Sequence, residues 1–406
     1  HHNILSNLQA LRPIVHDVFA AQSSIRLISF LSLSHAFERT LGHFMALDQG
    51  FELAFSRGIN FLTQDFVELQ PDFMISVPSI YERLFAELRC SFSKQNPWRQ
   101  RIFDWCVNVA QEYAHYLLSQ QKPGIVFEHT KLAIANQILF QPLRHQLGGR
   151  LKIAISGSAP LSPKLLEFFL GAGIPIVEGY GLTEASPVLT VNPPHAIRPG
   201  TVGLPLHNVE LKIAPQPEEN GHGEILARGP NIMLGYLNQP LETQQALSQE
   251  GWLHTGDIGY FDSDGYLILT ARRKALLKLN NGKYVAPEPL ERYLQAHPLI
   301  QQAVLLGDRR HACLALIVPD LQALRNEFPT LPLHTTQALQ HPSIQERFRE
   351  IFEEMHHTLD LARWEHIHTW RLLPIPFSQQ HDELTPTGKP KRQTIERNHA
   401  PLDEDR

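Results

Sequence analysis

The stretch that decides the fold class is LKIAISGSAPLSPKLLEFFLGAGIPIVEGYGLTE, residues 151–184. Its two apolar runs, Leu151–Ile155 and Ile174–Val177, predict buried strands, and a helical segment separates them. Strand, loop, helix and strand in this order are typical of a parallel sheet, in which ligands bind beyond the carboxyl ends of the strands. The small residues at 156–160 and 178–181 are predicted as loops at that edge. The chain is therefore predicted to be an α/β protein.

The limits of the helix are predicted from three residues. Ser162 is expected to cap it, Pro163 to occupy its first position, and Gly171 to follow its last turn. Upstream, residues 1–150 are predicted to be mostly helices joined by short strands, one of which is the apolar run Phe73–Val77.

After residue 205 apolar and polar residues alternate, which predicts antiparallel strands. Val209–Ile213 and Glu224–Ala227 form one such pair, and a second pair flanks the turn sequence Asp-Ser-Asp-Gly at 262–265. We therefore expect a large domain with parallel-type sheets over 1–205, an antiparallel β-subdomain of that domain over 206–273, and a small mobile α+β domain over 274–406.

Charge and cysteine content argue against several classes of protein. The 406 residues carry a formal charge of −5, whereas a nucleic-acid binder normally has a basic surface. Cys90, Cys106 and Cys313 lie far apart, which fits a reducing cytoplasm and not a disulfide framework or a zinc ribbon. No apolar run approaches the roughly 20 residues that span a bilayer, and the start has no signal-peptide pattern. A cytoplasmic protein is predicted, with peripheral contact at the inner face of a membrane left open.

Four short segments carry residues suited to nucleotide chemistry. In Tyr180–Glu184 (YGLTE) the ring can stack on a base, and a carboxylate beside phosphates suits magnesium. In Trp252–Asp257 (WLHTGD) the acid can bridge the hydroxyls of a ribose. Arg272–Lys274 is a basic triplet, and residues 384–392 (LTPTGKPKR) place a lysine where it can neutralise a carboxylate attacking a phosphate. Each segment alone also has a plain structural interpretation, as a turn or as a solvated charged face.

The order and joint presence of these segments resemble the adenylate-forming superfamily, which includes acyl-CoA synthetases and peptide-synthetase adenylation domains. The resemblance runs over nearly the whole chain and is strongest to the long-chain fatty-acid–CoA ligases. Three further stretches carry it, namely Ser32–Thr40, Ser76–Arg83 and Lys278–Glu288. The resemblance implies ATP, magnesium and coenzyme A as cofactors, and a long-chain fatty acid as the substrate.

The resemblance also implies a role for each matching residue. The implied catalytic residues are Lys389, Thr183 and Glu184, and Glu184 would also hold magnesium. The implied nucleotide-binding residues, some of which would also line the head of the acyl tunnel, are Gly157, Ser158, Ala159, Glu178, Gly179, Tyr180, Asp257 and Arg272. Lys274 would be the hinge about which the C-terminal domain turns.

The implied reaction has two steps. A fatty carboxylate attacks the α-phosphate of ATP and pyrophosphate leaves. The C-terminal domain then turns about Lys274, and a thiol attacks the acyl-adenylate. The thiol would be that of coenzyme A, with the phosphopantetheine of an acyl-carrier protein as the alternative acceptor.

Departures from the family pattern concern the start of the chain and the hinge. The family has a Ser/Thr/Gly-rich phosphate loop before a segment that His1–Leu5 resembles, so the chain is expected to begin just after that loop and to show little adenylation by itself. Ala271 and Ala275 replace residues usual beside the hinge, and Ser32 replaces a usual proline. The alternatives are a truncated nucleotide- or acyl-binding protein without catalysis, and a structural or interaction protein that reuses the fold.

Overall fold

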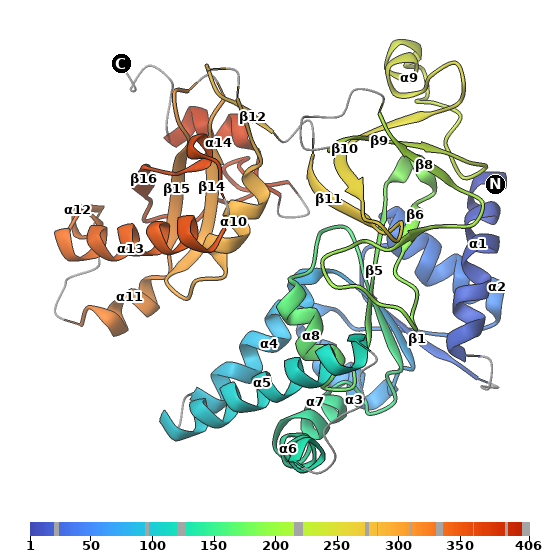
Figure 1. The fold of residues 1–406 in the computed structure, drawn as a ribbon, viewed down its shortest axis with the longest axis horizontal. Helices are drawn as coiled ribbons and strands as arrows, with labels where there is room; N and C mark the ends of the chain where they lie inside the picture. The colour runs from blue at the N-terminus through green and yellow to red at the C-terminus, as the bar shows by residue number, and fades with distance from the viewer. Residues whose placement is uncertain are drawn as a thin grey trace. The chain divides into compact units, whose positions relative to one another are not determined.

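The computed structural model describes residues 1–19, 24–93, 97–119, 127–214, 222–272, 276–281, 283–308, 310–329, 336–359, 361–385 and 389–399. The chain divides into two compact units, His1–Leu269 and Thr270–Arg406, which Figure 1 shows in ribbon form. Each unit has its own hydrophobic core. None of the described helices combines the length and the apolar character needed to cross a bilayer.

The central sheet of the first unit has the strand order β2-β1-β3-β4-β5-β6-β7. Neighbours from β2 to β5 pair in parallel, and β6 and β7 continue the sheet in antiparallel pairing. Its strands are β1 (Arg26–Ser29), β2 (Glu52–Phe55), β3 (Phe73–Ser76), β4 (Ile153–Ser156), β5 (Ile176–Gly181), β6 (Val188–Val191) and β7 (Leu204–Pro205). The predicted strands at Phe73 and Ile153 are confirmed, and so is the parallel pairing across the strand–helix–strand unit.

Helices lie on both sides of this sheet, with α4, α5 and α8 on one side and α1 and α2 on the other in Figure 1. In the first group α8 and α4 pack through aromatic rings. The ring centroids of Phe169 and Tyr81 lie 5.7 Å apart, and those of Phe168 and Phe85 lie 5.0 Å apart. The helical segments of this part of the chain, on either side of the sheet, are α1 (His2–Phe19), η1 (Glu38–Phe44), α2 (Met45–Gln49), η2 (Ile59–Phe61), α3 (Leu62–Leu69), α4 (Pro78–Ser93), α5 (Pro97–Ser119), α6 (Phe127–Ala135), η3 (Asn136–Phe140), α7 (Gln141–Gln146) and α8 (Pro163–Gly171).

The ends of α8 differ from the prediction. Ser162 precedes the helix, but its side chain makes no capping hydrogen bond. Gly171 is the last helical residue, and a Cβ there would lie 1.9 Å from the carbonyl oxygen of Ala110, so its glycine permits close packing against α5. Gly173, with φ of +81°, takes the left-handed conformation expected of Gly171.

Strand β5 is longer than predicted. Glu178–Gly181 was expected to be a loop, whereas these residues continue the strand and pair with β6. A Cβ on Gly181 would lie 2.0 Å from the carbonyl oxygen of Pro187. Glycine at this position therefore allows β5 and the segment at Pro187 to approach each other closely.

The rest of the first unit is an antiparallel sheet with the order β11-β10-β9-β8. Strand β9 pairs antiparallel with both β8 and β10, as predicted from the alternating sequence. The predicted hairpin at Asp262–Gly265 joins β10 to β11, which are neighbours in the sheet. The segments are η4 (Thr183–Ala185), β8 (Glu210–Ile213), β9 (Gly223–Arg228), α9 (Pro240–Ala246), β10 (Leu253–Phe261) and β11 (Leu267–Arg272).

The second unit is an α+β structure, which agrees with the predicted fold class. Its main sheet has the order β14-β15-β16, and β12 pairs separately with β13. Side chains such as Phe348 and Ile351 of α13 are buried in its core. The segments are β12 (Leu277–Lys278), β13 (Tyr284–Val285), α10 (Pro287–Gln295), β14 (Ile300–Leu306), β15 (Leu314–Pro319), α11 (Leu321–Glu327), α12 (Thr336–Leu339), α13 (Pro342–Thr358), η6 (Arg363–Glu365), β16 (Thr369–Leu372) and α14 (Arg392–His399).

Candidate active site

Tyr180 of β5 and Asp257 of β10 meet in the first unit. The Tyr180 hydroxyl donates a hydrogen bond to Oδ2 of Asp257 over 2.7 Å. Both side chains are nearly enclosed, with 8% and 7% of their surface exposed. The tyrosine segment and the acid, predicted from separate parts of the sequence, are therefore in direct contact in the structure.

A bulge in β10 directs Asp257. The sequence suggested a glycine turn, but the acid lies within the strand, where the register shifts between His254 and Ile258. Gly256 has φ of +71°, and its N–H donates to Glu224 over 3.1 Å. The amide of Asp257 donates over 3.1 Å to the hydroxyl of Thr255. The backbone that carries the acid is thus fixed by the hydrogen bonds of these two amides within the bulge.

The loop after β4 is held against β5 by Glu178. Its Oε1 accepts the N–H of Leu161 over 2.9 Å, and the glutamate is 4% exposed. Gly157 packs under the ring of Phe37, where a Cβ would lie 2.7 Å from the ring. Ser158 takes a left-handed φ of +68°, and it and Ala159 are exposed. The predicted residues of this loop thus lie beside the end of β5, with Glu178 holding the loop backbone.

Thr183 and Glu184 follow β5 in the short helix η4. Thr183 is exposed and Glu184 is half-buried. The Glu184 carboxylate accepts a hydrogen bond from the Tyr236 hydroxyl over 2.8 Å, and its backbone carbonyl accepts the N–H of Met233 over 2.8 Å. Thr183 and Glu184 offer hydroxyl and carboxylate oxygens, the donor type that magnesium takes together with phosphate oxygens and waters.

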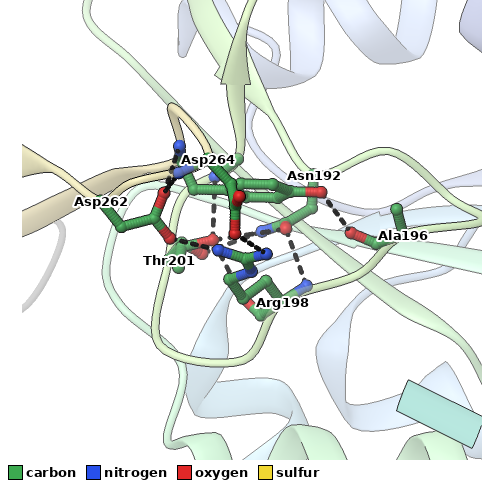
Figure 2. A network of polar contacts seen from close by, with 8 residues as sticks. Asn192, Ala196, Arg198, Thr201, Asp262 and Asp264 are labelled. Atoms are coloured by element: carbon green, nitrogen blue, oxygen red, sulfur yellow. Dashed lines mark hydrogen bonds and ion pairs between the residues drawn. The ribbon is translucent and has the colours of Figure 1, made fainter. Parts of the chain in front are cut away.

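A second polar network holds the β10–β11 hairpin to the loop after β6 (Figure 2). Arg198 pairs with Asp262, and its Nη2 lies 2.8 Å from Oδ2 of Asp264. The guanidinium also lies 4.2 Å from the ring centroid of Tyr266, whose hydroxyl donates to the carbonyl of Ala196 over 2.9 Å. Since β10 carries Asp257, this network helps to fix the strand that bears the acid.

Sequence reasoning missed both Tyr236 and Arg198. Each acts on a partner far along the chain, 52 residues away for Tyr236 and 64 residues away for the pairing of Arg198 with Asp262. Periodicity and turn motifs describe neighbours in sequence, so neither residue carried a signal of its role.

The remaining predicted residues lie at or beyond the start of the second unit. Arg272 ends β11, and its side chain is outside the described atoms, as is the whole of Lys274. Lys389 is exposed, its N–H donates to the Thr385 hydroxyl over 2.9 Å, and its carbonyl accepts the N–H of Thr385 over 2.8 Å. The roles of these three residues stay predictions, as do those of the other predicted site residues.

Comparisons with known proteins cover nearly the whole chain. The sequence profile of the family described as AMP-binding enzyme matches residues 1–237, and that of the AMP-binding enzyme C-terminal domain matches residues 274–400. The chain is 32% identical over 394 residues to a long-chain-fatty-acid–CoA ligase of Mycobacterium bovis, covering 94% of this chain and 63% of the relative. Long-chain-fatty-acid–CoA ligase 6 of Homo sapiens is 31% identical over 407 residues, covering 97% of this chain and 56% of the relative. The chain thus spans less than two thirds of the length of these relatives.

Solved structures with the same fold include two that hold nucleotide ligands. ATP-bound MatB from Rhodopseudomonas palustris has a TM-score of 0.64 and 20% identity, covering 98% of this chain and 64% of that chain. The o-succinylbenzoate CoA synthetase of Bacillus subtilis, in complex with its acyl-adenylate intermediate, has a TM-score of 0.65 and 18% identity, covering 97% of this chain and 64% of that chain. The predicted fold class is confirmed by this likeness.

Proposed function

The chain belongs to the AMP-binding enzyme family, and from that premise we propose that the protein is a long-chain fatty-acid–CoA ligase. It activates a fatty acid with ATP and transfers the acyl group to coenzyme A. The observation that carries the proposal is the buried hydrogen bond of 2.7 Å between Tyr180 and Asp257. It supports a single nucleotide site, with an aromatic ring for the base and a carboxylate for the ribose. The names of the relatives support the choice of substrate and acceptor.

In this proposal Asp257 binds the ribose hydroxyls. A carboxylate has about four acceptor positions, so Asp257 can accept the Tyr180 hydroxyl and a ribose hydroxyl together. The ring of Tyr180 lies beside the base, and Arg272 adds a donor to the ribose. The loop of Gly157, Ser158 and Ala159 closes the base pocket, while Glu178 and Gly179 support it from β5. Because the amides of Gly256 and Asp257 are already hydrogen-bonded, binding needs little reordering of the chain.

Adenylation joins the fatty acid to AMP. A carboxylate oxygen forms a bond to the α-phosphorus, and the bond from that phosphorus to the oxygen bridging to the β-phosphate breaks, which releases pyrophosphate. Both reactants are anions, so their repulsion is the main obstacle. Magnesium, when bound, supplies positive charge at the phosphates. Glu184 presents a carboxylate oxygen to the ion, Thr183 donates its hydroxyl to a phosphate, and Lys389 adds a second cation at the reacting oxygens.

Transfer of the acyl group requires a different arrangement. We propose that the C-terminal unit turns about Lys274, which withdraws Lys389 and brings the loop at Asn281 and Lys283 toward the thiol. The thiolate then forms a bond to the acyl carbon, and AMP leaves. Coenzyme A is the proposed acceptor, with carrier-protein phosphopantetheine as the alternative. Because long acyl chains partition into bilayers, we also propose that the cytoplasmic protein collects its substrate at the inner face of a membrane.

The test is exchange of labelled pyrophosphate into ATP, driven by palmitate. It uses the 406-residue chain and a chimera that adds, before His1, the segment of the Mycobacterium bovis relative that precedes the part matching this chain. We expect exchange by the chimera and little by the shorter chain. A chimera that binds AMP but exchanges no pyrophosphate would contradict the ligase proposal and favour a nucleotide-binding protein without catalysis. A chimera that binds no nucleotide would leave only a structural or interaction role.

A further inference from the structure

Tyr236 is tied to the residue proposed to hold magnesium. Its hydroxyl donates a hydrogen bond to Oε1 of Glu184 over 2.8 Å. The Tyr236 hydroxyl is therefore a hydrogen-bond donor to one oxygen of Glu184.

The segment before Tyr236 is fixed to the turn that carries Glu184. Asn231 is fully buried, and its side-chain amide donates to the carbonyls of Ala185 over 2.8 Å and Val188 over 3.1 Å. Two residues later, the N–H of Met233 donates to the carbonyl of Glu184 itself. These bonds hold the backbones of donor and acceptor in a set relation, so the side-chain contact does not depend on a flexible loop.

The other end of the segment is supported by Thr243 of α9. The N–H of Tyr236 donates to Oγ1 of Thr243 over 2.9 Å, and that hydroxyl donates to the carbonyl of Gln239 over 2.8 Å. Gly235 has φ of +145°, and a Cβ there would lie 2.6 Å from the methyl group of Thr243. The backbone of the Gly-Tyr pair thus fits closely against α9, which fixes the point from which the tyrosine side chain extends.

We propose that Tyr236 is a positioning residue that orients the Glu184 carboxylate for the divalent cation accompanying the nucleotide. The inference rests on the proposed function. The phenol occupies one carboxylate oxygen and thereby limits the rotation of the group, so that the other oxygen faces the cation. Partners of this kind, which hold a metal-binding side chain without touching the metal, typically change metal affinity 10–100-fold when removed.

The test compares wild-type protein with Tyr236→Phe, which keeps the ring and removes the hydroxyl. The probe is Mn²⁺ titrated into protein saturated with the non-hydrolysable analogue α,β-methylene-ATP, followed by the electron paramagnetic resonance signal of free Mn²⁺. A second titration measures binding of AMP without metal. The matched control is Tyr293→Phe, whose hydroxyl lies 3.2 Å from the Thr358 hydroxyl in the second unit.

We expect Tyr236→Phe to weaken Mn²⁺ binding about tenfold or more while leaving AMP binding unchanged, with Tyr293→Phe like the wild type in both titrations. Equal Mn²⁺ affinity in wild-type and Tyr236→Phe protein would overturn the inference. A parallel loss of AMP binding would also overturn it, because that pattern means a general disturbance of the site. A wild-type protein that binds neither AMP nor Mn²⁺ would instead overturn the proposed function, and this inference with it.

Discussion

The hydroxyl of Tyr180 donates a hydrogen bond to the carboxylate of Asp257, residues that are 77 positions apart in the sequence. The contact joins the central sheet to the antiparallel sheet, since Tyr180 lies on β5 and Asp257 on β10. Because both side chains are nearly buried, the hydrogen bond is shielded from competing water. The orientation of Asp257 therefore depends on Tyr180 before any ligand is bound.

Removing the Tyr180 hydroxyl should weaken nucleotide binding moderately. Tyr180→Phe keeps the ring but loses one hydrogen bond to a charged group, which contributes about 1.5–3 kcal/mol. Part of that loss reaches the ligand through the poorer orientation of Asp257, so we expect a decrease in AMP affinity of about threefold to tenfold, measured by isothermal titration calorimetry. The matched control is Tyr260→Phe on the same strand, whose ring stacks on His222 at 4.4 Å. Unchanged affinity in Tyr180→Phe would show that Asp257 needs no such support.

Arg198 should contribute to the stability of the first unit. Arg198→Ala removes two ion pairs and the stacking on Tyr266, and since the guanidinium is partly exposed we expect a loss of about 1 kcal/mol in the free energy of unfolding. Arg198→Lys keeps the charge but cannot bridge both carboxylates in the same way, so its loss should be intermediate. Chemical denaturation at low and at 1 M salt checks both variants, and the difference from wild type should shrink in salt. If the loss of stability does not depend on salt, Arg198 stabilises the unit by packing and not by its charge.

Glu38 should make stability depend on pH. Burial raises its pKa to about 7 from an ordinary value of 4.5, and the Ser29 hydroxyl donates to its Oε1. The folded state therefore binds a proton between these values that the unfolded state releases, so the free energy of unfolding falls as pH rises from 4.5 to 7. The fall is on the order of 3 kcal/mol.

Glu38→Gln tests this dependence, because glutamine resembles the protonated acid and cannot ionise. Urea denaturation of both proteins at pH 5 and pH 7.5 should show a smaller fall in the variant, with the difference between the two proteins due to Glu38. If both lose the same stability over that range, Glu38 titrates normally and the buried environment does not act on it.

Lys389 should be needed for adenylation, and Lys391 should not. Lys391 is paired with Asp382, whereas among the described residues the ammonium group of Lys389 contacts no carboxylate. In the active chimera, Lys389→Ala should slow pyrophosphate exchange by roughly two orders of magnitude or more, and Lys391→Ala should remain near the starting rate. Thioester formation from preformed palmitoyl-adenylate should survive in both variants. Loss of exchange in Lys391→Ala alone would move the catalytic role to that residue.

Local sequence patterns predicted most of the elements around the site. The parallel unit of β4, α8 and β5 followed from two apolar runs and a proline at the first helical position, and the Asp262–Gly265 hairpin followed from its turn residues. These features depend on neighbours in sequence, which periodicity describes well. Gly171 was predicted to lie just after the helix, whereas it is the last helical residue. A glycine is needed there because α5 packs against it, and this tertiary contact leaves no local sequence pattern.

Contacts between distant segments could not be predicted in the same way. The motifs indicated Tyr180, Glu184 and Asp257, but no pattern indicated that Tyr180 bonds to Asp257 or Tyr236 to Glu184. Likewise, the bulge that directs Asp257 arises from pairing between β9 and β10. Such pairings depend on how the sheets pack, which a single sequence does not display.

Binding of AMP to the 406-residue chain and to Asp257→Ala, measured by isothermal titration calorimetry, tests the shared nucleotide site most directly. Loss of the hydrogen bonds that the ribose hydroxyls donate to the carboxylate should weaken binding about 10–100-fold. Glu210→Ala, at an exposed ion pair with Arg228 on β8 and β9, should bind as the wild type does. We predict that pattern. Equal AMP affinity in wild-type and Asp257→Ala protein, or no AMP binding by the wild-type chain, would contradict it.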